Sequence, residues 1–250
     1  MRDTLSLLVQ ELEKAEEARI CKKGCKRKVS LIEETHEILQ GEKTSQRGGN
    51  KKMLKKYKII LLPNKKKKIN DLSEREAKDF FRWFLSIIPK RLSMLKEVIA
   101  QGDKRIAAKL DYSPQSLLYL GKWFSKNVSQ RKKTKAEITQ EKKEALKALP
   151  YYDVETKWTI TAETISLCFD IGIYFGTVFL KKHPSVKWDY VTKPKSNIDR
   201  NWPVLTGFRV PMNPINLMIN VAYGVTDGET YETRLKELYG IWFKELRKNW

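Results

Sequence analysis

Thr164-Ile-Ser-Leu-Cys-Phe-Asp-Ile-Gly-Ile-Tyr-Phe-Gly-Thr-Val-Phe-Leu180 is the one stretch of this 250-residue chain that is both long and almost entirely apolar. Such a stretch is typical of a membrane span or of a helix buried at the centre of a domain. A span needs about 20 apolar residues, and Asp170 at its middle would cost about 3 kcal/mol on insertion. We therefore expect no membrane span but a buried helix over residues 161–182, in which Gly172 and Gly176 let another backbone approach closely.

Asp170 lies between two large apolar residues, so its carboxylate must find a hydrogen-bond partner or take up a proton. We expect a structural role, with hydrogen bonds from Arg200, Arg209 or a tyrosine or tryptophan of the same block. Glu163 lies two turns earlier on the same helix face. Paired carboxylates can carry out acid–base chemistry, so an enzyme built on Glu163 and Asp170 is an alternative.

The segments around this helix predict an α+β fold that is predominantly helical, with helices packed around a small sheet. Short strands are expected over residues 187–192 and 204–210, and Asn213-Pro214 caps a helix that follows them. A last helix follows the break at Asp227-Gly228. We find no internal repeat with a period of 20–50 residues.

Upstream, Ser73-Glu74-Arg75-Glu76 is a capping box, and apolar residues then keep a helical face to Ile99. Pro89 lies inside this face and removes a backbone donor, which predicts a kink or break near Ser86. Residues 57–62 form a short apolar run ended by Pro63, which predicts a strand. Thr134-Lys135-Ala136-Glu137 is a second capping box, expected to open a mostly solvated helix.

The basic charge of the chain is concentrated in its first 150 residues. The net charge is +20, and residues 1–70 carry 19 Lys/Arg against 9 Asp/Glu, whereas residues 151–250 carry 13 against 11. This excess favours a polyanion or an acidic protein as partner. Candidate polyanion contacts come from two basic runs: Lys65, Lys66, Lys67, Lys68, Arg131, Lys132, Lys133 and Lys135.

Aromatic residues crowd the C-terminal hundred residues and offer a second kind of contact. Large aromatic side chains anchor many protein interfaces, although they also fill cores. The candidate anchors for a protein partner are Trp188, Tyr190, Trp202 and Phe208, with ordinary core packing as the alternative for each.

Residues 1–53 have few apolar side chains and include a linker with three glycines over residues 41–53. We therefore expect a basic, weakly ordered segment before a single globular domain over residues 54–250.

Cys21 and Cys25 lie close to His36 in the sequence, but a structural zinc site needs four ligands, and we expect free thiols. No signal-peptide pattern is present, which favours a cytoplasmic setting. We find no phosphate-binding loop, nucleophile elbow or metalloprotease motif, and expect no catalytic residue, cofactor or metal.

Residues 158–225 resemble an uncharacterised bacterial α/β family. The motifs that carry the resemblance are Asp170-Ile171-Gly172-Ile173-Tyr174-Phe175-Gly176, Lys187-Trp188-Asp189-Tyr190, Lys193-Pro194-Lys195, Asn201-Trp202-Pro203-Val204 and Met212-Asn213-Pro214. Members of this family are similar to small accessory and toxin-immunity proteins, so the resemblance implies a non-enzymatic role. Residues 1–57 have no counterpart, and the strong positive charge is a departure, since an immunity protein that blocks a nuclease would be acidic.

Together these observations predict a cytoplasmic, non-enzymatic binding protein, of immunity type by resemblance. It would contact a protein partner through its aromatic C-terminal block, with the lysine runs steering the encounter. The alternatives are a protein that binds the phosphate backbone of nucleic acid without sequence specificity, and the enzyme built on Glu163 and Asp170. Nothing in the sequence predicts the oligomeric state.

Overall fold

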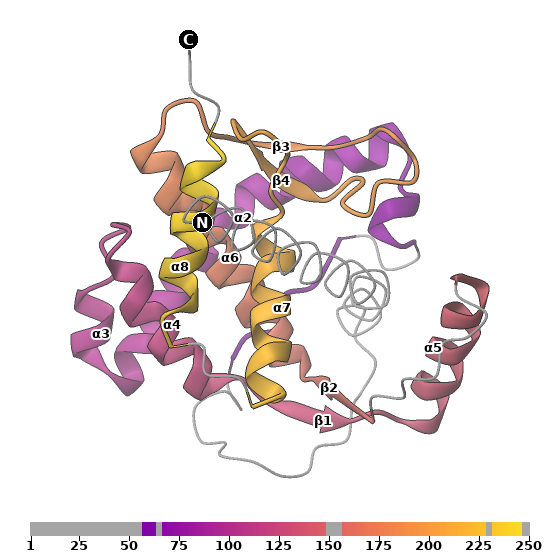
Figure 1. Ribbon diagram of the computed structural model, residues 1–250, viewed down its shortest axis with the longest axis horizontal. Helices are drawn as coiled ribbons and strands as arrows, with labels where there is room; N and C mark the ends of the chain where they lie inside the picture. The colour runs from indigo at the N-terminus through magenta and orange to yellow at the C-terminus, as the bar shows by residue number, and fades with distance from the viewer. Residues whose placement is uncertain (1–56, 64–66, 149–156, 229–231, 247–250) are drawn as a thin grey trace, which may run out of the picture.

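The computed structural model describes residues 57–63, 67–148, 157–228 and 232–246, and shows a helix-dominated α+β fold (Figure 1). The N-terminal half contains the 3-10 helix η2 (Ile69–Asp71), helices α2 (Glu74–Gly102), α3 (Lys104–Ala108), α4 (Ser116–Asn127) and α5 (Lys135–Ala148), and strand β1 (Gln130–Lys132). The C-terminal half contains strands β2 (Trp158–Ile160), β3 (Lys187–Tyr190) and β4 (Pro203–Thr206), and helices α6 (Ala162–Lys182), α7 (Pro214–Thr226) and α8 (Arg234–Lys244).

Helix α6 lies at the centre of the molecule and packs against α7 and α2 (Figure 1). It begins where the Thr161 hydroxyl accepts a hydrogen bond from the Thr164 amide at 3.3 Å, and it ends one residue before His183. This confirms the helix predicted over residues 161–182. Of the described residues, α6 is the one helix long and apolar enough to cross a bilayer, but most of that apolar stretch is buried inside the fold.

The two glycines of α6 permit two different close approaches. A Cβ atom on Gly172 would lie 3.0 Å from main-chain atoms of Pro214 and Ile215, so the start of α7 sits directly on the α6 backbone, as predicted. A Cβ atom on Gly176 would lie 2.6 Å from Cζ2 of Trp188. Here the close neighbour is an aromatic ring of β3 and not a backbone.

The strands form two separate antiparallel pairs. Strand β1 pairs with β2, with Arg131 opposite Thr159, and β3 pairs with β4, with Trp188 opposite Leu205. The second pair confirms the strands expected over residues 187–192 and 204–210, although both are shorter than predicted. It lies across one end of the helices, and the first pair lies at the opposite end (Figure 1).

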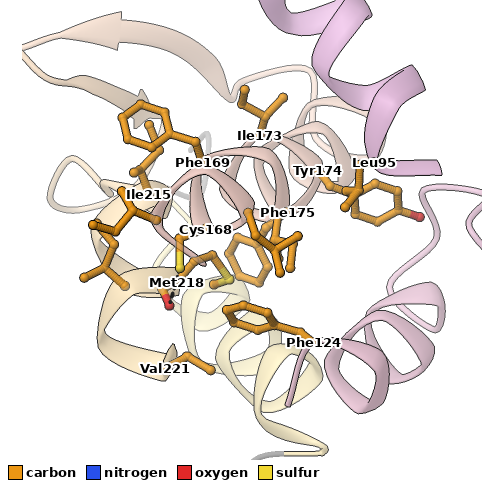
Figure 2. Packing of buried hydrophobic residues seen from close by; sticks show 14 of the residues in the cluster. Leu95, Phe124, Cys168, Phe169, Ile173, Tyr174, Phe175, Ile215, Met218 and Val221 are labelled. Atoms are coloured by element: carbon orange, nitrogen blue, oxygen red, sulfur yellow. Dashed lines mark hydrogen bonds between the residues drawn. The ribbon is translucent and has the colours of Figure 1, made fainter. Parts of the chain in front are cut away.

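The buried apolar side chains join into one core that includes residues from Tyr57 to Leu238. Figure 2 shows its centre, where Phe175 of α6, Phe124 of α4 and Met218 of α7 converge. The thiol of Cys168 is fully buried there and donates to the carbonyl oxygen of Met218 at 3.5 Å.

One sequence-based prediction about secondary structure is wrong, and so is one of the two alternatives, a kink or a break, expected near Ser86. Residues 57–62 are not paired as a strand, because the groups that face them are the side chains of Arg91 and Ser166 and not another strand. Helix α2 is not broken near Ser86, because Phe84 and Leu95 are both buried in the core and hold the helix on either side of Pro89. The capping box at the start of α2 is confirmed, with Ser73 and Glu76 exchanging hydrogen bonds.

Candidate functional site

The most elaborate polar arrangement in the described part of the chain is a buried ion pair between α2 and α6. Arg91 Nε donates to Asp170 Oδ1 at 2.6 Å, and Arg91 Nη2 donates to Asp170 Oδ2 at 2.8 Å. The Tyr57 hydroxyl also donates to Asp170 Oδ2. The Asp170 side chain is 0% exposed and that of Arg91 is 6% exposed, so both charges are balanced inside the protein.

Burial and pairing act in opposite directions on these groups. Burial raises the pKa of Asp170 to about 6, although the charge and hydrogen bonds of Arg91 and the hydroxyl of Tyr57 pull it down. Burial and the neighbouring carboxylate hold the pKa of Tyr57 well above its usual value. Tyr57 is therefore a hydrogen-bond donor at any physiological pH, and Arg91 is the group that keeps Asp170 ionised near neutrality.

The position of Arg91 on α2 explains why the pair forms. Arg91 lies seven residues after Phe84 and four before Leu95, so it occupies a place in the apolar stripe that faces α6. Asp170 lies in the part of α6 that faces this stripe, as the ion pair shows. Each charge would be costly alone in this interior, and each compensates the other.

The ion pair anchors residues 57–62, which we call the edge segment. Arg91 Nη1 donates to the carbonyl oxygen of Lys58 at 3.0 Å, and the Ile60 amide donates to Ser166 Oγ at 3.0 Å. The side chains of Ile60 and Leu62 are buried, whereas those of Ile59 and Leu61 are 38% and 55% exposed. This alternation has the period of two that an extended chain gives.

The main chain of the edge segment is bonded on one side only. The carbonyl of Lys58 and the amide of Ile60 both point into the protein, so the groups of the alternate residues Ile59 and Leu61 point the other way. Among the described residues, the main-chain amides and carbonyls of Ile59 and Leu61 have no hydrogen-bond partner. The segment therefore presents an unpaired row of donors and acceptors beside two exposed apolar side chains.

The structure corrects the expected partners of Asp170. Neither Arg200 nor Arg209 contacts it, because its oxygens are taken by Arg91 and Tyr57 from the N-terminal half of the chain. Glu163 is half-buried in the first turn of α6, about 10 Å from Asp170 along the helix axis. The two carboxylates do not form a pair, and Asp170 is closed to solvent.

Two of the four aromatic candidates are core residues and not surface anchors. Trp202 is 0% exposed and Phe208 is 1% exposed, because α6 and the C-terminal elements cover both rings. Trp188 and Tyr190 are half-buried and pack against Phe84 and Phe81 of α2. The predicted aromatic surface is thus largely part of the interior.

The run at residues 131–135 is also mostly engaged within the protein. Arg131 is buried and donates to Glu137 at 3.0 Å, and the Lys133 ammonium is paired with Glu141 at 2.6 Å. These two cations are not a polyanion surface, because α5 supplies their counterions. Lys132 and Lys135 are exposed, and the Lys132 ammonium lies 5.4 Å from the ring centroid of Trp158.

The other basic run is only partly described. Lys67 forms an exposed ion pair with Glu76 at 2.8 Å, and Lys68 is half-buried. Lys65 and Lys66 lie outside the described residues, as do Cys21, Cys25 and His36. Within the described residues, no three histidine, cysteine or acidic side chains gather where a metal ion could be held.

Arg91 and Tyr57 were not predicted as the partners of Asp170. The signal for Arg91 is its place in the apolar stripe of α2, where one cation among large apolar residues requires a buried anion, and Asp170 is the acid within the buried apolar part of α6. Comparisons with protein-family models, curated proteins and solved structures find no match to this chain. The resemblance to a bacterial α/β family stays a prediction.

Proposed function

We propose that this chain is a non-enzymatic cytoplasmic binding protein that takes up an extended, acidic segment of a protein partner along its edge segment. The observation that carries the proposal is the one-sided hydrogen bonding of residues 57–62. An extended peptide that adds alongside an unpaired main chain gains main-chain hydrogen bonds, and pockets or apolar contacts at alternate residues add specificity. Ile59 and Leu61 supply such contacts.

Anchoring makes the edge segment suitable for this kind of binding. The segment is held by Arg91, Asp170 and Ser166, which belong to the two longest helices of the described structure. A preformed edge loses little conformational entropy when a partner adds to it. The ion pair therefore has a role in presenting the binding edge as well as in the core.

The lysines in and around the edge segment favour an acidic partner. Lys58 is exposed within the edge segment, and in the sequence Lys55, Lys56, Lys65 and Lys66 lie within four residues of its ends. Like charges placed opposite one another oppose association and unlike charges favour it. These lysines disfavour pairing of the edge with a second copy of this chain and favour a segment with acidic flanks.

The test uses two synthetic peptides with the same alternating valine and threonine centre, one flanked by glutamates and one by lysines. We expect the glutamate-flanked peptide to bind at least about tenfold more tightly. Hydrogen exchange at the amides of Ile59 and Leu61 should slow on binding, because these are the donors that the added strand would use. Equal affinity for the two peptides, or unchanged exchange at both amides, would contradict the proposal.

A matched pair of variants separates the main chain from the side chain. Leu61→Pro removes an amide that the fold does not use, whereas Leu61→Ala shortens the same side chain and keeps the amide. We expect Leu61→Pro to abolish peptide binding and Leu61→Ala to weaken it only a few-fold, with similar melting temperatures for both. Loss of binding in both to the same extent would mean that the main chain is not the contact. The nucleic-acid alternative would be favoured by a different result. The protein would then bind a random DNA duplex with an affinity that falls steeply as salt rises, and it would bind neither peptide.

A further inference from the structure

A pocket of about 550 Å³ lies between the first turn of α2 and the connection from β3 to β4. Three cationic side chains line it, those of Lys193, Lys195 and Arg200, against a single acid, Glu74. This size is typical of pockets that hold small organic ligands, which occupy about 300–1,000 Å³. No residue of the edge segment lines this pocket, and the proposed function does not use it.

The connection that carries the cations is fixed at several points. The Asn201 side-chain amide donates to the carbonyl oxygens of Ile69 and Leu72, both at 3.0 Å. The carboxylate of Asp199 accepts from the side-chain amides of Asn213 and Asn216 at 2.9 and 2.6 Å. The residues before and after Arg200 are therefore tied to the 3-10 helix and to the start of α7.

Arg200 is positioned by its own backbone and by one nitrogen of its side chain. Its Nε donates to the carbonyl oxygen of Thr192 across the connection at 3.3 Å, and its backbone forms a bridge with Val191. Within the described residues its two terminal nitrogens have no hydrogen-bond partner. A guanidinium held in this way offers a planar pair of donors, which is the geometry that suits two oxygens of a phosphate group.

The two lysines are also without counterions. Lys193 and Lys195 are exposed and form no ion pair with another described residue, and Glu74 is the one carboxylate beside them. The first turn of α2 is already capped by Ser73 and Glu76, so the positive character of the pocket comes from side chains and not from the helix end. Three cations against one anion leave a net positive lining, which favours a ligand that brings more than one negative charge.

We propose that this pocket binds a phosphate ester group of a small ligand, with Arg200 as the bidentate contact and Lys193 and Lys195 as the neutralising charges. The volume exceeds that of a phosphate ion alone, so part of an organic body would enter with the group. The phosphate could belong to a soluble metabolite or to a lipid headgroup, and the chemistry of recognition is the same for both.

The test is calorimetric titration of the full chain with pyrophosphate, with a mixture of nucleoside 5′-monophosphates, and with vesicles that contain phosphatidylinositol phosphate. We expect at least one of these three ligands to bind, and sodium sulfate at equal ionic strength should not displace it. Binding of pyrophosphate or of the nucleoside monophosphates would identify a site for soluble phosphate compounds, and binding of the vesicles alone would identify a headgroup site. No binding by any of the three would overturn the proposal.

Substitutions distinguish this pocket from the general positive charge of the protein. Lys195→Ala and Arg200→Lys should each weaken binding about tenfold, the second because an ammonium cannot make the bidentate contact. The control is Lys135→Ala with Lys143→Ala on α5, which removes two exposed cations away from the pocket. Equal weakening by the control would show that only net charge matters and would overturn the assignment, provided that the melting temperatures of all variants agree.

Discussion

Asp170 is fully buried, and a single cation, Arg91, balances its charge. Removing one member of such a pair leaves the other as an uncompensated buried charge, which typically costs about 3–5 kcal/mol. Arg91→Met should lower the free energy of unfolding by that amount at neutral pH, because it leaves the Asp170 carboxylate without a cation, whereas Tyr57→Phe, which removes one hydrogen bond, should lower it by about 1–2 kcal/mol. Urea denaturation of the three proteins measures both differences.

The same pair gives a pH dependence with a defined sign. The pKa of Asp170 is raised in the folded protein to about 6 from its usual value of 3.8, so the folded state holds this proton at a higher pH than the unfolded state does. The stability that the folded state gains by holding this proton is therefore fully present below about pH 4, and it is lost as pH rises through about 6. The difference in unfolding free energy between wild type and Asp170→Asn should change across this window. A constant difference would contradict the assigned direction.

The sequence predicted that Asp170 needs a partner but not which one. The prediction rested on local composition, since a carboxylate in an apolar helix must be compensated. The partner Arg91 is 79 residues away and Tyr57 is 113 residues away, so their identity depends on how α2 packs on α6. Trp202 and Phe208 show the same limit, because an aromatic residue next to a short strand has the same local sequence whether its ring faces the core or the solvent.

Among the secondary-structure elements, α6 depends on close contacts that only glycine allows. In Gly176→Ala the new methyl group would lie 2.6 Å from the Trp188 ring, which must then move. We expect a loss of roughly 1–3 kcal/mol, as for other overpacked cores. Gly240→Ala on α8 is the matched control, because nothing lies within 4 Å of its Cβ position, and it should stabilise the protein by up to about 1 kcal/mol. Thermal unfolding of both variants tests the contrast, and a Gly176→Ala protein as stable as wild type would show that Trp188 is free to shift.

The helix ends were the most predictable part of the fold. Three caps read from the sequence are present in the structure, at Ser73, Thr134 and Asn213, because a cap is decided by residues within one turn. The edge segment was predicted as a strand from its short apolar run, and the structure shows instead an unpaired extended segment whose side chains are alternately buried and exposed. The sequence did not show that one side of the segment would face side chains instead of a second strand, since strand pairing is a long-range property.

Over the whole molecule, the net charge of +20 should make stability depend on salt. Like charges repel in the compact state, and raising ionic strength from about 0.01 M to about 0.15 M shortens the screening length from about 30 Å to about 8 Å. The ion pairs Arg91–Asp170 and Lys133–Glu141 are largely buried and are screened much less than the exposed lysines. We therefore expect the melting temperature to rise with sodium chloride across this range. A fall would mean that the exposed pairs, such as Lys67–Glu76, stabilise the fold more than the excess charge destabilises it.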